Sequence, residues 1–155
     1  MRQFPSIASF VAHLATLPAV MHHAQREGEE AAGRVLVRET KAIIGTERDE
    51  WPALAESTVA QKQARGQTGR VSATDPLLAT GAMRDTIDAT VDQTGVTLGS
   101  TSPLAPFHEF GTGRIPARPF IGPTMFRHGH AAAETIAHHV VAAVAGDRKP
   151  PARQS

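Results

Sequence analysis

Histidine is the residue type that most invites a chemical interpretation here, because eight histidines occur in a chain of 155 residues. Imidazole binds metal ions and transfers protons near neutral pH, so histidine clusters can indicate a metal site or an acid–base centre. The sequence contains no HExxH motif, and adjacent histidines on a helix point about 100° apart, which suits shared coordination badly. We therefore interpret the clusters as solvated helix surface and expect no metal site, and we keep a metal-dependent hydrolase only as a third hypothesis. The clustered residues are His22, His23, His128, His130, His138 and His139.

Nucleophilic catalysis is the second chemistry that the sequence could suggest. His108 and Glu109 follow the hydroxyl residues Ser100, Thr101 and Ser102, as members of a hydrolytic triad could. The chain has no GxSxG motif and no aspartate in an obvious orienting position. The glycine-containing segment GTGR at 111–114 matches neither a Walker loop nor a GxGxxG fingerprint. Cysteine is absent, which excludes thiolate nucleophiles, disulfides and cysteine-bound metals. We expect no catalytic and no cofactor-binding residues.

The positive charges could form a surface for nucleic acid or for an acidic protein. The formal net charge is only +1, which argues against a protein that coats nucleic acid but leaves a local basic patch open. Arg118 differs from the other cations because proline and apolar residues surround it. Such an arginine buries its stem and uses its guanidinium for an ion pair or for backbone carbonyls, within the subunit or across subunits. The cations considered are Lys62, Arg65, Arg70, Arg84, Arg114 and Arg118.

The length and composition fit one folded domain. Hydrophobic residues make up 41% of the chain, enough to bury a core, whereas aromatic residues make up only 5%. We predict a single domain over residues 1–146, with a mobile loop at 65–75 and a flexible tail at 147–155. No run of about 18 apolar residues could cross a bilayer, and the N-terminus makes a poor signal peptide. We expect a soluble protein that is cytoplasmic where it is made.

The first third of the chain predicts long helices. Ser6 is a plausible N-cap, and an apolar stripe with helical spacing follows it, formed by Ile7, Phe10, Val11, Leu14 and Leu17. Pro18 should end or kink this helix. A second helix is expected over 19–44 with Gly45 as its stop, although Gly28 and Gly33 weaken it.

The remaining elements are shorter until the C-terminal helix. Helical stretches are predicted up to about residue 64, near 80–84 and at 103–110, and period-2 patterns at 87–91 and 96–98 predict an antiparallel hairpin. The proline-rich segment 115–123 should be extended. Thr124 should cap a final helix that ends at Gly146, with the inner face Phe126, Ala133, Ile136, Val140 and Val144. Together these elements predict an α+β domain, in which a long N-terminal helix and a C-terminal helix pack on a small antiparallel sheet with an extended proline-rich arm.

Four motifs occur in order along the middle of the chain. They are WPAL at 51–54, LATGAMRDTI at 78–87, a hairpin ending in VTLGS at 96–100, and the pair HEFGT at 108–112 and IPARPFIGP at 115–123. This series resembles the tailed-bacteriophage virion-morphogenesis family that includes the Mu protein G-like tail-completion proteins. The pattern is also similar to that of the neck proteins of siphophages.

The resemblance implies a non-enzymatic structural protein of the head–tail junction. Such a protein would form a ring of six- or twelvefold symmetry between connector and tail, and would be needed to finish the tail or to join it to the filled head. Its partners would be further copies of itself, head-closure or connector proteins, and tail-terminator or tail-tube proteins. DNA could pass through the lumen, and no membrane would be involved. It would be assembled in the host bacterial cytoplasm and reside in the virion.

Candidate interface residues follow from this resemblance. Arginine and aromatic residues are enriched at interface hot spots, which favours Arg118 and Phe120 as anchors. The competing interpretation is that Phe107, Phe110 and Phe120 fill the core of the subunit itself. A nucleic-acid-binding accessory factor that uses the cations of residues 65–84 is the alternative function. The interface candidates are Arg70, His108, Glu109, Arg114, Ile115, Arg118 and Phe120.

Overall fold

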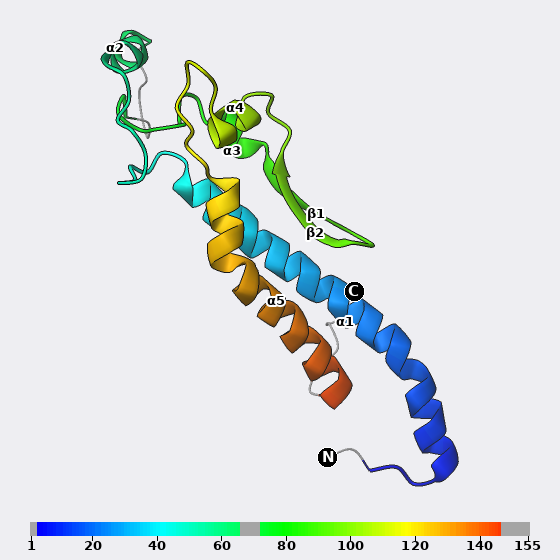
Figure 1. Cartoon of the computed structure of the whole chain (residues 1–155). Coiled ribbons are helices and arrows are strands. Elements are labelled where there is room, and N and C mark those ends of the chain that lie inside the picture. Colours follow the sequence, from blue (N-terminus) through cyan, green and yellow to red (C-terminus); the bar gives the residue numbers. More distant parts are fainter. Residues whose placement is uncertain (1–2, 66–71, 147–155) are drawn as a thin grey trace, which may run out of the picture.

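The computed structural model describes residues 3–65 and 72–146. Most of the predicted loop at 65–75, including Arg70, and the whole predicted tail at 147–155 lie outside the described residues. The elements are the helices α1 (Ile7–Ile43), α2 (Glu56–Ala64), α3 (Ala82–Asp85), α4 (Ala105–Phe110) and α5 (Ile121–Ala145), and the strands β1 (Ile87–Asp92) and β2 (Gly95–Ser100). The predicted α+β class is confirmed (Figure 1).

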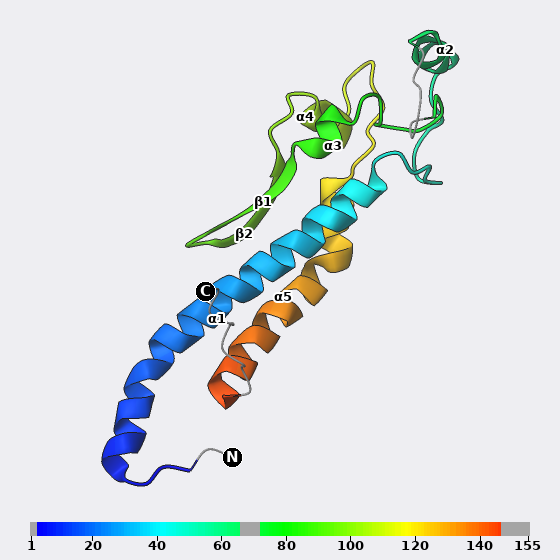
Figure 2. The ribbon, with the colours of Figure 1, turned by 180° about the vertical axis from the view of Figure 1, so that it is seen from behind.

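Helix α1 is the longest element, and it runs without interruption through Pro18. Ser6 caps it as expected: its hydroxyl accepts a hydrogen bond from the Ser9 N–H at 3.1 Å, and the Ser9 hydroxyl accepts one from the Ser6 N–H at 3.2 Å. The prediction of a separate helix beginning after Pro18 is wrong. Pro18 is exposed, and so is Leu14, whose carbonyl the proline leaves unpaired, so water can bind that carbonyl. The helix curves in its blue N-terminal part (Figure 2).

Helix α5 lies antiparallel along α1, and this contact is the most extensive among the described helices and strands (Figures 1 and 2). The two backbones approach closely at Gly28, where a Cβ atom would lie 2.8 Å from Cα of Ile136. Around this point Ala24 and Ala32 are buried on α1 and Ala132 is buried on α5. Small residues therefore let the two helices approach each other. The low helix propensity of Gly28 is offset by the close packing that its missing side chain allows.

The predicted inner face of α5 is only partly correct. Ile136 and Val140 are partly buried, but Phe126 is 92% exposed, and Ala133 and Val144 are exposed. The contact of Ile136 with Gly28 fixes the rotation of α5. The buried positions are Thr124 and Ala132, and Ala132 lies four residues before Ile136 and so shares its face of the helix. Thr124 is not the cap. The helix begins at Ile121, and the Thr124 hydroxyl donates to the Phe120 carbonyl at 2.8 Å.

The hairpin packs on α1 beside the α5 contact. Strands β1 and β2 pair antiparallel from Ile87 with Ser100 to Asp92 with Gly95, as the alternating pattern predicts. A Cβ atom on Gly33 would lie 3.2 Å from Cβ of Ala89 and 3.5 Å from Cγ1 of Val96, so the second glycine of α1 admits the hairpin. The described residues contain only this two-stranded sheet.

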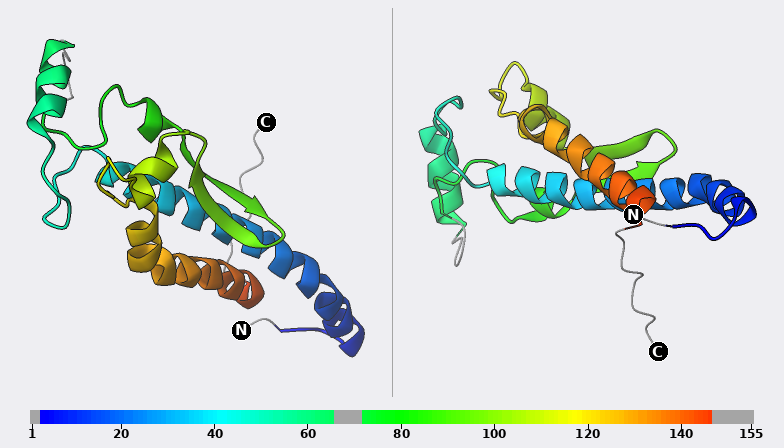
Figure 3. Two further views of the ribbon diagram at one scale, coloured as in Figure 1. Left: turned by 45° about the horizontal axis from the view of Figure 1, so that its top comes forward. Right: turned by 90° about the horizontal axis from the view of Figure 1, so that it is seen from below.

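The larger core cluster lies where α1 ends. It joins the last residues of α1 to Trp51, to residues before the hairpin and to the arm that precedes α5; the buried members are Ile43, Ile44, Trp51, Leu78, Met83, Ile87, Ala105 and Phe120. Helix α2 stands apart from the other helices at this end (Figure 3). Its Lys62 is buried and donates to the Asp75 carbonyl at 2.6 Å, and burial lowers the pKa of this ammonium group.

The contact at Gly28 predicts a position-specific cost for a side chain. Gly28→Val should lower the free energy of unfolding by about 2–3 kcal/mol, because the added atoms meet the α5 backbone. The matched control is Gly129→Val on α5, where an added Cβ meets nothing within 4 Å, and this variant should keep or slightly raise stability. Urea unfolding followed by circular dichroism measures both. Equal effects of the two substitutions would contradict the close approach.

Candidate assembly site

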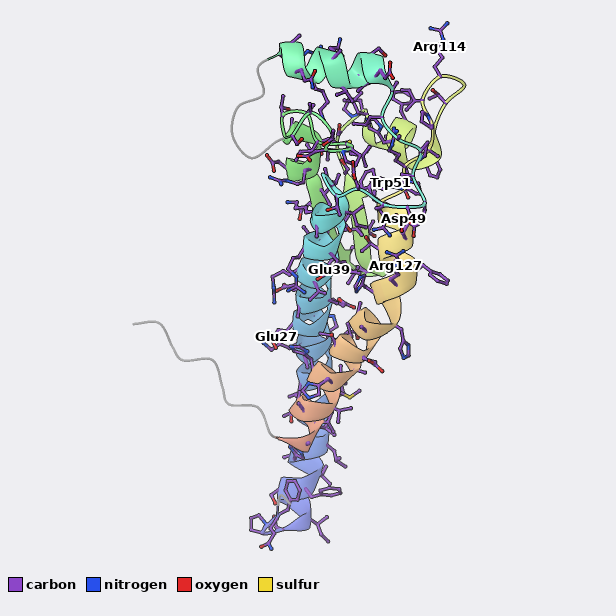
Figure 4. All side chains as sticks on the ribbon, turned by 90° about the vertical axis from the view of Figure 1, so that its left-hand side faces the viewer. Glu27, Glu39, Asp49, Trp51, Arg114 and Arg127 are labelled. Atoms are coloured by element: carbon purple, nitrogen blue, oxygen red, sulfur yellow. The ribbon has the colours of Figure 1, made fainter. Side chains whose placement is uncertain are left out.

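Three of the sequence motifs meet at the start of α5. The WPAL segment, the HEFGT segment at the end of α4 and the proline-rich arm before α5 are separated by up to 66 residues in sequence, yet hydrogen bonds connect all three. Figure 4 shows Trp51 inside this end of the molecule and Arg114 projecting from it. We call these connected segments the motif junction.

Glu109 caps helix α5 from outside the helix. Its carboxylate accepts hydrogen bonds from the N–H groups of Phe120 at 2.8 Å, Ile121 at 3.0 Å and Gly122 at 2.7 Å. These are donors that a helix N-terminus leaves unpaired, and the positive end of the helix dipole favours a carboxylate there. The first turn of α5 has no acidic residue and its N-cap makes no side-chain hydrogen bond, so Glu109 supplies the cap that the local sequence lacks.

Arg118 connects the arm to the WPAL segment. Its guanidinium Nη2 donates to the carbonyl of Pro52 at 2.8 Å and to that of Ala53 at 3.2 Å, and its backbone N–H donates to the His108 carbonyl at 2.7 Å. The side chain is 6% exposed. The sequence leaves open whether the guanidinium makes an ion pair or binds backbone carbonyls, within the subunit or across subunits. In the structure it binds backbone carbonyls within the subunit. Burial lowers the pKa of Arg118 below its usual value.

The phenylalanines divide between core and surface. Phe120 is 0% exposed and belongs to the larger core cluster together with Trp51. Phe107 and Phe110 of α4 are 48% and 80% exposed, so the interpretation that they fill the core is wrong. Leu104, just before α4, is also exposed. Arg118 and Phe120 therefore support the junction from inside, and their side chains are not on the surface of the subunit.

A tight loop projects from the junction between α4 and the arm. Gly111 has φ +74, and a Cβ atom there would lie 2.8 Å from the Ala117 nitrogen, so this position requires glycine. The Thr112 N–H donates to the Ile115 carbonyl at 2.8 Å, and the Thr112 hydroxyl accepts from the N–H groups of Arg114 and Ile115. The loop is thus held by its own hydrogen bonds, with Arg114 exposed and directed away from the subunit (Figure 4).

We call Leu104, Phe107, Phe110 and Arg114 the assembly surface. Its three apolar side chains are exposed in and just before α4, and its arginine is exposed in the loop that follows. Exposed apolar residues and arginine are typical of protein–protein contacts. Among the predicted interface residues, Arg114 lies on this surface and Ile115 is partly buried at its edge. Sequence reasoning assigned no contact role to Leu104, Phe107 or Phe110. The apolar spacing of such a short helix cannot tell which side of the helix faces the core.

His108 is half-buried behind the assembly surface. Its Nδ1 atom is buried without a hydrogen-bond partner among the described residues. Burial lowers the pKa of His108, and the nearby positive charge of Arg118 lowers it further. The imidazole is therefore neutral at pH 7, and protonation would place a second positive charge next to Arg118.

The remaining chemical candidates have structural partners or lie apart. The Ser100 hydroxyl shares a hydrogen bond of 2.7 Å with the Thr86 hydroxyl and accepts one from the Ser102 N–H. Within residues 3–65 and 72–146, no group of three or more His, Cys, Asp or Glu residues could hold a metal ion. No helix in the same ranges is long and apolar enough to span a membrane.

The predicted basic set is divided by the fold. Lys62 is buried and Arg118 is buried, whereas Arg84 is partly exposed with its guanidinium 3.8 Å from the Asp85 carboxylate. Arg114 projects from the loop at the motif junction (Figure 4). Two of the six cations are thus unavailable to a nucleic acid. Among the described others, Arg84 lies in α3 and Arg114 in the loop after α4.

Comparison with known proteins gives one match. A family model described as the phage virion morphogenesis family matches residues 9–150. This range includes α1 from its third residue onward, the motif junction and α5. No curated protein and no solved structure was found to match the chain.

The capping role of Glu109 can be tested by removing its charge. Glu109→Gln should lower the free energy of unfolding by about 1–2 kcal/mol, because an amide oxygen replaces a carboxylate that accepts three N–H groups at a helix N-terminus. Glu134→Gln, in the exposed middle of α5, is the control and should change it little. Chemical denaturation measures the difference. A Glu109→Gln variant as stable as the wild type would show that the cap is dispensable.

The buried position of His108 predicts a pH dependence of stability. The pKa of His108 in the folded protein lies below the unfolded value of 6.5, so between these two pKa values the unfolded chain binds more protons. Stability from this residue is present above pH 6.5 and should be lost as the pH falls through 6.5 toward the folded pKa. The substitution His108→Gln should reduce the loss of stability between pH 7.5 and pH 5.5. The substitution His22→Gln, at an exposed position, is the control and should not reduce it. Thermal unfolding of all three proteins at pH 7.5 and pH 5.5 makes the comparison.

Proposed function

Because the chain belongs to the phage virion morphogenesis family, which gives it a role in building the virion, we propose that it is a structural protein of the head–tail junction. In this proposal, copies of the chain form a ring between the connector and the tail, and the ring is needed to complete the tail or to join it to the filled head. The protein acts by presenting surfaces to its neighbours and not by catalysis.

The observation that carries the proposal is the assembly surface on the motif junction. Phe110 is 80% exposed and Arg114 is exposed in the loop that follows α4, yet both are attached to segments that are fixed by the Glu109 cap and the buried Arg118. A surface that is held in place before binding loses little conformational entropy when a partner docks. Repeated contacts of this kind between unlike faces close into rings when the rotation between subunits permits.

The candidate interface residues take different roles in this proposal. Arg114 and Ile115, together with the phenylalanines of α4, contact a neighbouring protein. Glu109, His108, Arg118 and Phe120 position this surface from behind. Arg70, which lies outside the described residues, stays a candidate contact. The neighbours would be further copies, a head-closure or connector protein, and a tail-terminator or tail-tube protein, around a lumen through which DNA passes.

A stop codon in the gene for this chain tests the role in the phage. We expect electron micrographs to show filled heads and tails that accumulate separately, or malformed tails, and we expect wild-type protein supplied in trans to restore infectious particles. If infectious virions form normally without the protein, the structural role is wrong and a nucleic-acid-binding accessory role takes its place.

The assembly surface itself can be tested in the same complementation system. The double substitution Phe110→Ser and Arg114→Glu should reduce the yield of infectious particles by at least about tenfold, because it removes an exposed apolar contact and reverses a charge. The control Arg34→Glu changes another exposed arginine, on α1, and should complement like the wild type. Circular dichroism verifies that both variants fold. Full complementation by the double variant would place the contact elsewhere.

A further inference from the structure

The N-terminal part of α1 extends past every other element. Helix α1 has 37 residues and α5 has 25, so at 1.5 Å per residue they are about 55 Å and 37 Å long. The blue end of α1 continues beyond the red end of α5 and beyond the tip of the hairpin (Figures 1 and 3). We call residues 7–21 the α1 arm.

The α1 arm carries an uncovered apolar stripe. Its members recur at the spacing of one helical face, and all are exposed, Ile7 to 84%: they are Ile7, Phe10, Val11, Leu14 and Met21. The N-terminal end of the arm is well defined, because the reciprocal Ser6 and Ser9 hydrogen bonds cap it and Phe4 packs edge-on against Phe10 at 5.3 Å between ring centroids.

This stripe continues the face of α1 that packs on α5. Ile7, Leu14, Met21 and Gly28 are spaced by seven residues, and a heptad falls only about 20° short of two helical turns. Gly28 is the point of closest approach to α5, so the stripe is the same face of the helix, followed toward the N-terminus. It is exposed because α5 ends at Ala145, before it can cover the arm. Exposed Val141 and Val144 lie in the last turns of α5.

The chemistry of the arm favours a protein partner over a lipid surface. No Asp, Glu, Lys or Arg occurs between Arg2 and Arg26, so the side of the arm opposite the stripe is also uncharged. Helices that lie on membranes carry lysine and arginine on that side. A helix in water gains most of its stability from packing of its apolar face, and among residues 3–65 and 72–146 only Phe4 packs against this stripe.

We propose that the α1 arm packs, through Ile7, Phe10, Val11 and Leu14, against a second copy of this chain. Within the subunit the same face already packs on α5 through small and apolar residues, Ala132 and Ile136. Every further copy brings another uncovered apolar stripe on an arm that has no charged residue. This inference deepens the proposed function, because it names the surface through which copies associate and the chemistry of their contact. It adds a site to the assembly surface, which lies at the opposite end of the molecule.

Self-association of the purified full chain tests the inference. Sedimentation equilibrium over a range of concentrations should show oligomers of the wild type. The double substitution Phe10→Ser and Leu14→Ser should raise the dissociation constant at least about tenfold. The control pair Ala12→Ser and Ala19→Ser introduces the same two serines on the opposite side of the arm and should leave the constant unchanged.

Hydrogen exchange gives a second readout that does not depend on the variants. Amides of residues 10–21 should become protected as the wild-type concentration rises through the association range, while amides of the α1–α5 contact stay protected throughout. A wild type that remains monomeric, or a serine pair that associates as tightly as the wild type, overturns the inference. The stop-codon experiment is separate from both: failed head–tail joining with a monomeric protein would reject the arm contact and keep the junction role.

Discussion

The close approach of α1 and α5 at Gly28 is the constraint on which the rest of the fold depends. A Cβ atom at this position would lie 2.8 Å from the α5 backbone, so the rotation and depth of α5 are fixed by the absence of a side chain. Five residues later Gly33 does the same for the hairpin, with Ala89 and Val96 as its neighbours. Each glycine costs about 1 kcal/mol of helix propensity, but together they let α1 pack against α5 on one face and against the hairpin on another.

With α5 fixed along α1, its N-terminus becomes the place where distant segments of the chain meet. Glu109 caps α5 from the end of α4, and Arg118 ties the arm before α5 to the Pro52 and Ala53 carbonyls. The guanidinium of Arg118 is buried, and the carboxylate of Glu109 bonds only to backbone N–H groups. If the partners of either group moved, its lost hydrogen bonds would cost free energy, so both groups hold these segments in place. The exposed side chains of α4 and Arg114 take their positions from these bonds. A surface for neighbours at one end of the molecule thus follows from packing in its middle.

The sequence was most informative where local rules decide the structure. The alternation from Ile87 to Leu98 and the Ser6 cap follow from period and hydrogen-bonding chemistry alone, and both are present. The proline-rich setting of Arg118 predicted a buried stem and carbonyl partners, but not which carbonyls. Local sequence rules give wrong predictions where exposure to solvent or a contact with a distant segment determines the structure. Pro18 does not end α1 because the helix is exposed there, and the cap of α5 comes from Glu109, which no pattern around Thr124 could indicate. The apolar pattern of α5 places Phe126 on the inner face, but it is exposed because the close approach at Gly28 sets the rotation of the helix.

In the proposed function this chain is a component of the virion at the junction of head and tail, where it contacts its neighbours through surfaces held by the motif junction. The most direct test of this location is immunogold electron microscopy of purified wild-type virions, labelled with antibodies raised against the full chain. We expect mass spectrometry of the same particles to detect the protein and gold label to gather at the head–tail junction. Purified, infectious virions that lack the protein would contradict the claim.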